Sequence, residues 1–196
     1  MITGIVFLAL YSKETIHLSI NGWHHPVFDF LFKYITYLGD GWVFAGAFLI
    51  LIFIKWRYVT GLIMAALLTL LLTGFFKQVV FKGEPRPVKY FEGEVNLRQV
   101  DGVDIHHYQS LPSGHTTTAF ACFGFLALLA NRAGVMLFCF LIAAAVGYSR
   151  VYLSQHFLLD VVAGAFLGTF IALLAYYLMR KLNWPANEAR LRPFKT

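Results

Sequence analysis

The chain has 196 residues, of which 59% are hydrophobic, 17% aromatic and only 13% charged. A soluble domain carries about 25% charged residues, so the composition excludes an ordinary soluble protein and indicates one membrane-embedded domain over residues 1–196. The formal net charge of +6 gives no reason to expect nucleic acid as a partner. The basic residues lie at the ends of apolar segments, where membrane topology and anionic headgroups favour them.

The apolar segments predict an all-α, integral membrane bundle of six helices, because a span needs about 20 residues. The first span begins near Met1 and continues amphipathically towards Leu18. Pro26–Leu38 is amphipathic and aromatic, which predicts a helix at the membrane interface. The five further expected spans are Gly41–Trp56, Tyr58–Val80, His115–Ala130, Ala133–Tyr152 and His156–Met179. The basic tail, residues 180–196, is expected to be disordered or to lie on the headgroups.

A polar loop, Lys82–Pro112, separates the third and fourth expected spans. Residues 95–100 and 103–106 alternate in polarity around Asp101-Gly102, which predicts a small hairpin with a tight turn. Two functions remain open for it: an ordered cap on the loop, or a lid that selects the substrate.

The charges of the connecting segments predict the orientation. Residues 55–57, residues 131–132 and the tail from Arg180 together carry eight basic residues and one acidic residue, Glu188. The opposite side carries eight basic and nine acidic residues. The positive-inside rule therefore places the first side and both termini in the cytoplasm, and the polar loop outside.

Two pairs of small residues lie inside the apolar spans. Gly164 and Gly168 have the Gly-x-x-x-Gly spacing, which predicts close packing of the last span against a neighbour. Cys122 and Cys139 are interpreted as small core residues, because the sequence contains neither a disulfide framework nor a zinc-binding spacing.

The segment from Ser149 to Asp160 carries the strongest chemical signal. Charged groups near hydrocarbon are costly unless they have partners, so they are rarely without a function. If a helix begins at Gln155, His156 and Asp160 lie at i and i+4 on one face. The carboxylate can then hold the imidazole and leave its other nitrogen nucleophilic. Arg150 adds a planar guanidinium suited to phosphate, so the segment predicts phosphoryl chemistry at a histidine.

A second motif, Pro112-Ser113-Gly114-His115, lies where the fourth span begins. A helix N-terminus offers unpaired N–H groups and partial positive charge to a phosphate. Ser113 can cap the helix or donate to a phosphate oxygen, and Gly114 permits close approach of the backbone. His115 is placed to protonate a leaving alkoxide. An ordinary serine cap beside an interfacial histidine is the alternative.

A third cluster lies just after the third span. Pro85 and Pro87 stiffen the backbone around Arg86, and Lys77 lies further back inside the span. A snorkelling lysine and a turn arginine at the headgroups would be the ordinary interpretation. The three clusters are expected on the same membrane face, however, which favours one common site.

The three clusters resemble the motifs of the type 2 phosphatidic acid phosphatase (PAP2) superfamily, which is related to vanadium haloperoxidases and bacterial acid phosphatases. The motif Pro-Ser-Gly-His is complete at 112–115. The motif Ser-Arg-x5-His-x3-Asp is complete at Ser149, Arg150, His156 and Asp160. The motif Lys-x6-Arg-Pro is matched in part, since eight residues rather than six separate Lys77 from Arg86, as a two-residue insertion would produce. The resemblance covers residues 77–160 as the core of the domain.

The resemblance implies a role for each matched residue. His156 attacks phosphorus to form a phosphohistidine, Asp160 orients its ring, and His115 protonates the leaving alcohol and then activates water. The equatorial oxygens are bound by Lys77, Arg86 and Arg150 with Ser113 and Gly114. Fixed cations replace a metal, so no cofactor is expected. The adjacent pairs His24-His25 and His106-His107 are interpreted as interfacial polar contacts rather than metal ligands.

The expected function is a metal-independent lipid phosphatase in a bacterial inner membrane, with its site facing the periplasm or the cell exterior. The candidate substrates are phosphatidylglycerol phosphate, phosphatidate, undecaprenyl diphosphate and phosphorylated lipid A. A phosphotransferase would use the same residues, so the sequence does not separate the two. A transporter with a His–Asp proton relay would need ionisable groups near the bilayer midplane. A haloperoxidase is disfavoured by the membrane embedding. The oligomeric state is not predicted.

Overall fold

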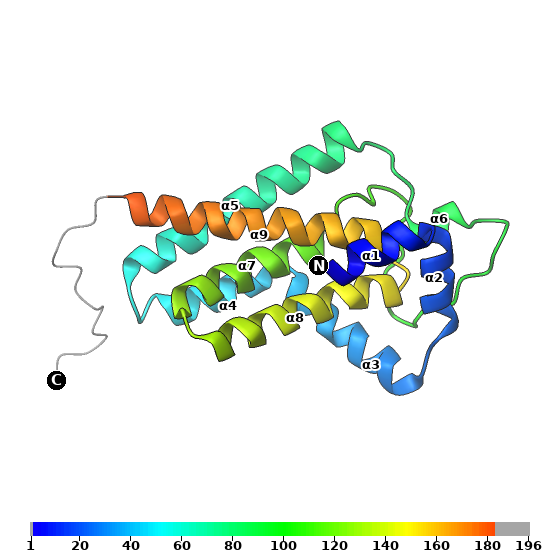
Figure 1. Ribbon diagram of the computed structural model, residues 1–196, viewed down its shortest axis with the longest axis horizontal. Coiled ribbons are helices and arrows are strands. Elements are labelled where there is room, and N and C mark those ends of the chain that lie inside the picture. Colours follow the sequence, from blue (N-terminus) through cyan, green and yellow to red (C-terminus); the bar gives the residue numbers. More distant parts are fainter. Residues whose placement is uncertain (1, 183–196) are drawn as a thin grey trace.

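The three-dimensional structure is a computed structural model, in which residues 2–182 are described (Figure 1). The described residues are helical apart from loops, and they contain no β-strand, so the predicted all-α class is confirmed. The elements in chain order are α1 (Ile2–Leu10), α2 (Lys13–Gly22), α3 (Pro26–Ile35), the 3₁₀ turn η1 (Thr36–Gly39), α4 (Trp42–Leu51), α5 (Trp56–Phe75), the π-turn η2 (Phe76–Val80), α6 (Pro87–Tyr90), α7 (Gly114–Ala130), α8 (Ala133–Tyr152) and α9 (Leu158–Lys181).

Helix α7 forms the centre of the bundle and packs against α5, α8 and α9. Small residues let these helices approach closely. A methyl group added to Gly164 of α9 would lie 2.7 Å from the Ser113 carbonyl oxygen, and one added to Gly168 would collide with the Thr117 carbonyl oxygen. The close packing predicted from the Gly164 and Gly168 spacing is therefore confirmed.

Three helical segments are long and apolar enough to cross a bilayer: Trp56–Val80, Ala133–Tyr152 and Leu158–Lys181. The segments Pro26–Gly39 and Trp42–Leu51 form a pair bent by 63° that qualifies as a fourth. The expected interfacial helix and second span are therefore two arms of one bent unit. The count of six spans stays a prediction, because α1, α4 and α7 are each shorter than a full span.

The expectation of a continuous first helix towards Leu18 is wrong. Helix α1 ends at Leu10 and α2 begins at Lys13. The break has a local cause, since Ser12 has extended backbone angles and its side chain accepts a hydrogen bond from the Thr15 N–H at 3.2 Å. A serine in this position favours the start of a new helix over continuation of the old one.

The predicted hairpin in the polar loop is also wrong, although its tight turn is present. Gly102 has φ +71°, and the Val103 N–H donates to the Val100 carbonyl at 3.2 Å. No ladder forms between the two arms, because polar groups of the loop bind α2 and α3 instead. Asn21 exchanges two hydrogen bonds with the backbone of Arg98, at 2.9 and 3.1 Å.

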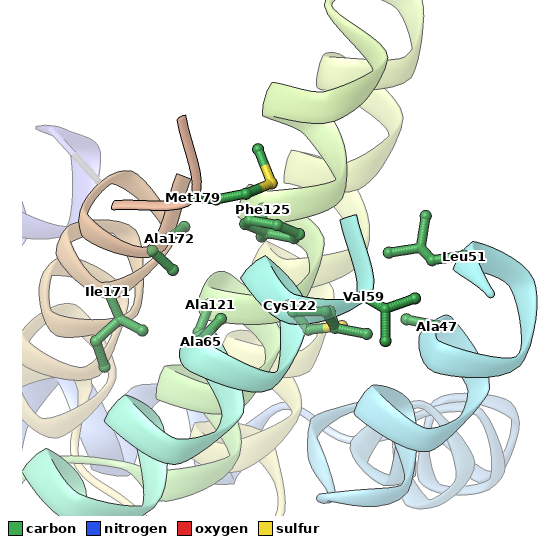
Figure 2. Packing of buried hydrophobic residues seen from close by; sticks show 12 residues of the cluster. Ala47, Leu51, Val59, Ala65, Ala121, Cys122, Phe125, Ile171, Ala172 and Met179 are labelled. Atoms are coloured by element: carbon green, nitrogen blue, oxygen red, sulfur yellow. The ribbon is translucent and has the colours of Figure 1, made fainter. Parts of the chain in front are cut away.

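An apolar core fills the half of the bundle away from this loop, between α4, α5, α7 and α9 (Figure 2). Phe125 of α7 is fully buried there, and a methyl group on Gly61 of α5 would lie 2.5 Å from its ring. Cys122 of α7 is also fully buried in this core. Cys139 of α8 is buried outside it, and both thiols are free. Both cysteines are core residues, as predicted.

The two sides distinguished by charge lie at opposite ends of the bundle (Figure 1). The polar loop, α6 and the first turns of α7 and α9 occupy one end, hereafter the loop end. The basic segments 55–57 and 131–132 and the end of α9 occupy the other. The predicted tail beyond residue 182 and both chain termini lie outside the described residues.

Candidate active site

Seven polar or charged side chains are buried together at the loop end. They come from the turn before α6, the start of α7, the end of α8 and the start of α9, and they are Arg86, Ser110, Ser113, Arg150, Gln155, His156 and Asp160. Buried polar groups are costly unless they have partners, so the hydrogen bonds of each one matter.

His156 is 1% exposed and precedes α9 rather than lying on it. The expected helix start at Gln155 is wrong, because the N–H groups of Gln155 and His156 both donate to the Arg150 carbonyl, at 2.9 and 3.1 Å, and close the end of α8. The expected contact still forms, since Nδ1 of His156 lies 3.3 Å from Oδ2 of Asp160. The turn between the helices therefore leaves Nε2 as the ring nitrogen free for chemistry.

The Asp160 carboxylate is held by more than the histidine. Its Oδ2 accepts a hydrogen bond from the Ser110 hydroxyl at 2.5 Å and another from the Phe157 N–H at 3.0 Å. Ser110 also lies 3.5 Å from Nδ1 of His156. The sequence interpretation missed Ser110, since a serine two residues before Pro112 in a loop carries no spacing signal of its own. These contacts fix the carboxylate that orients His156.

Arg86 and Arg150 approach the site from opposite sides. Arg86 donates from Nε to the Tyr108 carbonyl at 3.0 Å, and Arg150 donates from Nη1 to the Thr36 hydroxyl at 2.6 Å. Both donate to the side-chain oxygen of Gln155, at 3.3 and 3.5 Å. Among the described residues, neither guanidinium forms an ion pair with a carboxylate. Two buried arginines that share a neutral amide favour an anionic ligand.

The electrostatics of this cluster act on His156. Burial holds its pKa well below the ordinary value, and the positive charges of Arg86, Arg150 and Lys77 lower it further. Burial also lowers the pKa of Arg86 to about 10, which leaves that side chain charged at neutral pH. His156 is therefore neutral at neutral pH, which is the state that a nucleophilic imidazole needs.

The start of α7 differs in one detail from the prediction. The Ser113 side chain is fully buried and accepts a hydrogen bond from the Thr116 hydroxyl at 2.9 Å, so the alternative of an ordinary serine cap on the helix backbone is not realised. The Ser113 N–H donates to the Asp160 carbonyl at 3.0 Å and joins the starts of α7 and α9. This bond places the Pro112–His115 motif beside His156.

Lys77 joins the same site despite its altered spacing. It lies in the π-turn η2, which accommodates an additional residue in a helix. A methyl group added to Gly114 would lie 3.7 Å from Nζ of Lys77. The amine therefore reaches the backbone at the start of α7.

His115 has a carboxylate partner of its own, Asp40, which the sequence interpretation missed. Nε2 of His115 lies 2.8 Å from Oδ1 of Asp40. Asp40 lies at the bend between η1 and α4, next to Gly39, where an added methyl group would lie 2.7 Å from Cβ of His115. Only glycine permits this approach, so the bend brings the carboxylate to the histidine.

A groove and a polar cavity meet at His115 and Asp40. A groove of about 480 Å³ runs from Lys77 and His115 along α4, α5 and α7 to apolar residues such as Leu70. An apolar cavity of about 350 Å³ between α4 and α5 shares Phe44 and Ala66 with it. A polar cavity of about 230 Å³ lies on the other side, between η1 and the loop. The site is therefore open to an apolar route and to a polar one.

All eight residues predicted for the site lie together at the loop end: His156, His115, Asp160, Lys77, Arg86, Ser113, Gly114 and Arg150. The described residues contain no group of three or more potential metal ligands. His25 instead accepts a hydrogen bond from the Val27 N–H at 3.2 Å and begins α3, as expected for an interfacial polar contact.

Known proteins resemble the chain in sequence and in fold. The PAP2 superfamily model matches residues 56–184. Lipid phosphate phosphatase 1 of Arabidopsis thaliana is 34% identical over 60% of this chain, and this chain spans only 43% of that protein. Lipid A 4'-phosphatase of Bacteroides thetaiotaomicron is 28% identical over 85% of this chain and 76% of its own length.

A solved structure agrees with the arrangement of the helices. A transmembrane PAP2 type phosphatidylglycerolphosphate phosphatase from Bacillus subtilis matches 93% of this chain and 92% of its own, with a TM-score of 0.70 and 23% identity. The family model covers more than half of the sequence, including every residue of the site except Asp40 and Thr36. The chain belongs to the PAP2 superfamily.

Proposed function

We propose that this PAP2 phosphatase hydrolyses a phosphate ester of a membrane lipid through a phosphohistidine on His156. The convergence of Arg86, Arg150 and Lys77 around this one neutral, carboxylate-bound histidine carries the proposal. Three fixed cations beside a nucleophile are the arrangement that phosphoryl transfer requires.

The reaction proceeds in two displacements. Nε2 of His156 attacks phosphorus, the phosphorus–oxygen bond to the lipid breaks, and the leaving alkoxide takes a proton from His115. Water then gives a proton to His115 and attacks phosphorus, and the phosphorus–nitrogen bond breaks. Inorganic phosphate and neutral His156 result. Lys77, Arg86 and Arg150 stabilise the charge on the equatorial oxygens in both steps.

The apolar groove supports a lipid as the substrate. It leads from His115 and Lys77 between α4, α5 and α7, and it continues into the cavity between α4 and α5. The exposed side chains of these helices are largely apolar, as expected for a surface that faces acyl chains. Phosphatidylglycerol phosphate, phosphatidate, undecaprenyl diphosphate and phosphorylated lipid A are the candidates.

A panel of these lipids tests the function. Purified protein should release phosphate from at least one of them, with His156→Ala as the blank. EDTA should leave the rate largely unchanged, because the cations of the site are side chains. Vanadate should inhibit by adopting the five-coordinate geometry of the transition state. Phosphate release that persists in His156→Ala would refute the proposed nucleophile.

We further propose that the loop end faces the periplasm or the exterior of a bacterial cell. The separation of the basic segments at the opposite end supports this orientation. A cysteine introduced at exposed Asp101 should react with a membrane-impermeant maleimide in intact cells. A cysteine at exposed Lys55 should react only after the membrane is opened, and the reverse pattern would invert the topology.

A further inference from the structure

The polar cavity beside His115 contains side chains that belong to none of the three motifs. Lys33, Asp104 and His106 line it, together with Asp40, His115 and Arg150. His115 protonates the leaving oxygen in the proposed reaction, so the first atoms of the leaving group lie at the opening of this cavity. The cavity therefore adjoins the part of the substrate that differs most between lipid phosphates.

The polar loop forms one wall of the cavity through residues 102–104 and 106, and side chains of α3 hold this wall in place. Nζ of Lys33 donates to the Asp101 carbonyl at 2.6 Å, and an added methyl group on Gly102 would lie 2.5 Å from that same nitrogen. Arg98 further along the wall forms an ion pair with Asp29 of α3 at 2.5 Å. These contacts preform the wall, which lowers the cost of ordering it when a ligand binds.

The charges of the cavity do not suit a second phosphate. Arg150 already belongs to the group of cations around His156. Burial lowers the pKa of His106, and the charges of Arg86 and Arg150 lower it further, so its imidazole is neutral at neutral pH. The remaining charged side chains are the carboxylates of Asp40 and Asp104 and the ammonium of Lys33. Carboxylates beside a neutral imidazole bind hydroxyl groups well and repel anions.

We infer that this cavity binds a hydroxyl-bearing headgroup, from a sugar or a polyol, on the alcohol that leaves. The inference rests on the proposed function and narrows its substrates. The diacylglycerol that leaves from phosphatidate has no hydroxyl group to place there besides the leaving oxygen itself. A lipid diphosphate would place its second phosphate directly beside Asp40, where like charges repel, whereas the diester of phosphatidylglycerol phosphate lies further away, beyond the hydroxyl-bearing carbon of its glycerol. A monophosphate on a hydroxyl-rich headgroup is the substrate class that fits.

The test compares four substrates of similar chain length in mixed micelles: a diacyl glucosamine phosphate, phosphatidylglycerol phosphate, phosphatidate and undecaprenyl diphosphate. The kcat/KM of the full chain is measured for the wild type, for Asp104→Asn and for Asp101→Asn. The last variant is a matched control, because Asp101 is exposed on the same turn and is not among the residues that line the cavity.

The wild type should prefer the glucosamine or the glycerol phosphate over phosphatidate by about tenfold, as two hydrogen bonds would give. The ratio of kcat/KM between the glucosamine phosphate and phosphatidylglycerol phosphate then shows whether a sugar or a polyol is the preferred headgroup. Asp104→Asn should lower this preference at least about threefold and raise the relative rate with the diphosphate. Asp101→Asn should leave both ratios within about twofold.

Equal rates with all monophosphates in the wild type would overturn the inference. So would an unchanged preference in Asp104→Asn, an equal loss on all four substrates, or the same change in Asp101→Asn. If the folded wild type releases phosphate from none of the four, the proposed function itself fails.

Discussion

The two ends of the bundle bury opposite kinds of side chain. Around Phe125, the core between α4, α5, α7 and α9 is apolar, and alanine and leucine are its most frequent residues (Figure 2). At the loop end, where the starts of α7 and α9 meet, two arginines and the pair of His156 and Asp160 are buried. The apolar end stabilises the fold. The loop end lowers the stability, because its charged side chains are removed from water.

The contrast separates stability from activity along the molecule. A buried arginine without a carboxylate partner contributes little to folding, because the cost of removing it from water is not recovered. A buried phenylalanine contributes several kcal/mol through packing alone. Substitutions at the two ends should therefore have opposite effects, and each prediction below tests this division.

The largest effect on activity is expected from His156→Ala. Loss of the nucleophile should lower kcat by at least about 10³-fold, while the thermal unfolding temperature in detergent stays near that of the wild type. His24→Ala is the matched control, because His24 is exposed and lies outside the site. A small loss of kcat would contradict the assignment of activity to the loop end, since His156 is its proposed nucleophile.

Arg150→Met should separate the two properties most clearly. Removing one cation from the transition state should lower kcat by about 10²-fold or more. The unfolding temperature should stay the same or rise, because the variant buries an apolar side chain where a charge without a carboxylate partner was buried. Arg132→Met, at the exposed opposite end, should change neither. A strongly lowered unfolding temperature for Arg150→Met would show that the loop end also stabilises the fold.

Asp40→Asn tests the partner of His115. The variant keeps the shape of the side chain but removes the charge 2.8 Å from Nε2. We expect about a tenfold lower kcat, because the amide no longer balances the positive charge that the imidazole acquires when it takes a proton. Asp101→Asn serves as a control for loss of a carboxylate at the same end of the bundle, because its side chain is exposed. An unchanged kcat would mean that Asp40 neither positions His115 nor balances its charge.

The pH dependence of phosphoenzyme formation should reflect the burial of His156. Its pKa lies below the ordinary histidine value, so the nucleophile stays neutral as the pH falls through about 6.5. Rapid-quench measurements of the first turnover should therefore give an acid limb well below about pH 6.5, the ordinary histidine value. An acid limb near 6.5 or above would show an imidazole in ordinary contact with water.

The smallest effect on activity, and the largest on stability, is expected from Phe125→Ala. The variant leaves a cavity in the apolar core and should lower the free energy of unfolding by about 3–5 kcal/mol. The kcat of the remaining folded protein, measured well below its unfolding temperature, should change less than about twofold. A large loss of kcat in folded protein would show that activity at the loop end depends on the packing of the apolar core.

Local patterns in the sequence predicted the helices and the motif residues, because apolar runs and short spacings are decided by neighbours in the chain. The break at Ser12 was missed, since a single capping serine interrupts an apolar run without altering its composition. The hairpin failed because Asn21 and Lys33, far away in sequence, bind the loop instead. Ser110 and Asp40 join the site through tertiary contacts that no spacing encodes.

The direct test of the account is to trap the covalent intermediate. The protein is mixed with a ³²P-labelled lipid phosphate, quenched in alkali and digested. The account predicts an acid-labile, alkali-stable label on the peptide that contains His156. Label on another residue, label that persists in His156→Ala, or hydrolysis with no labelled histidine would contradict it.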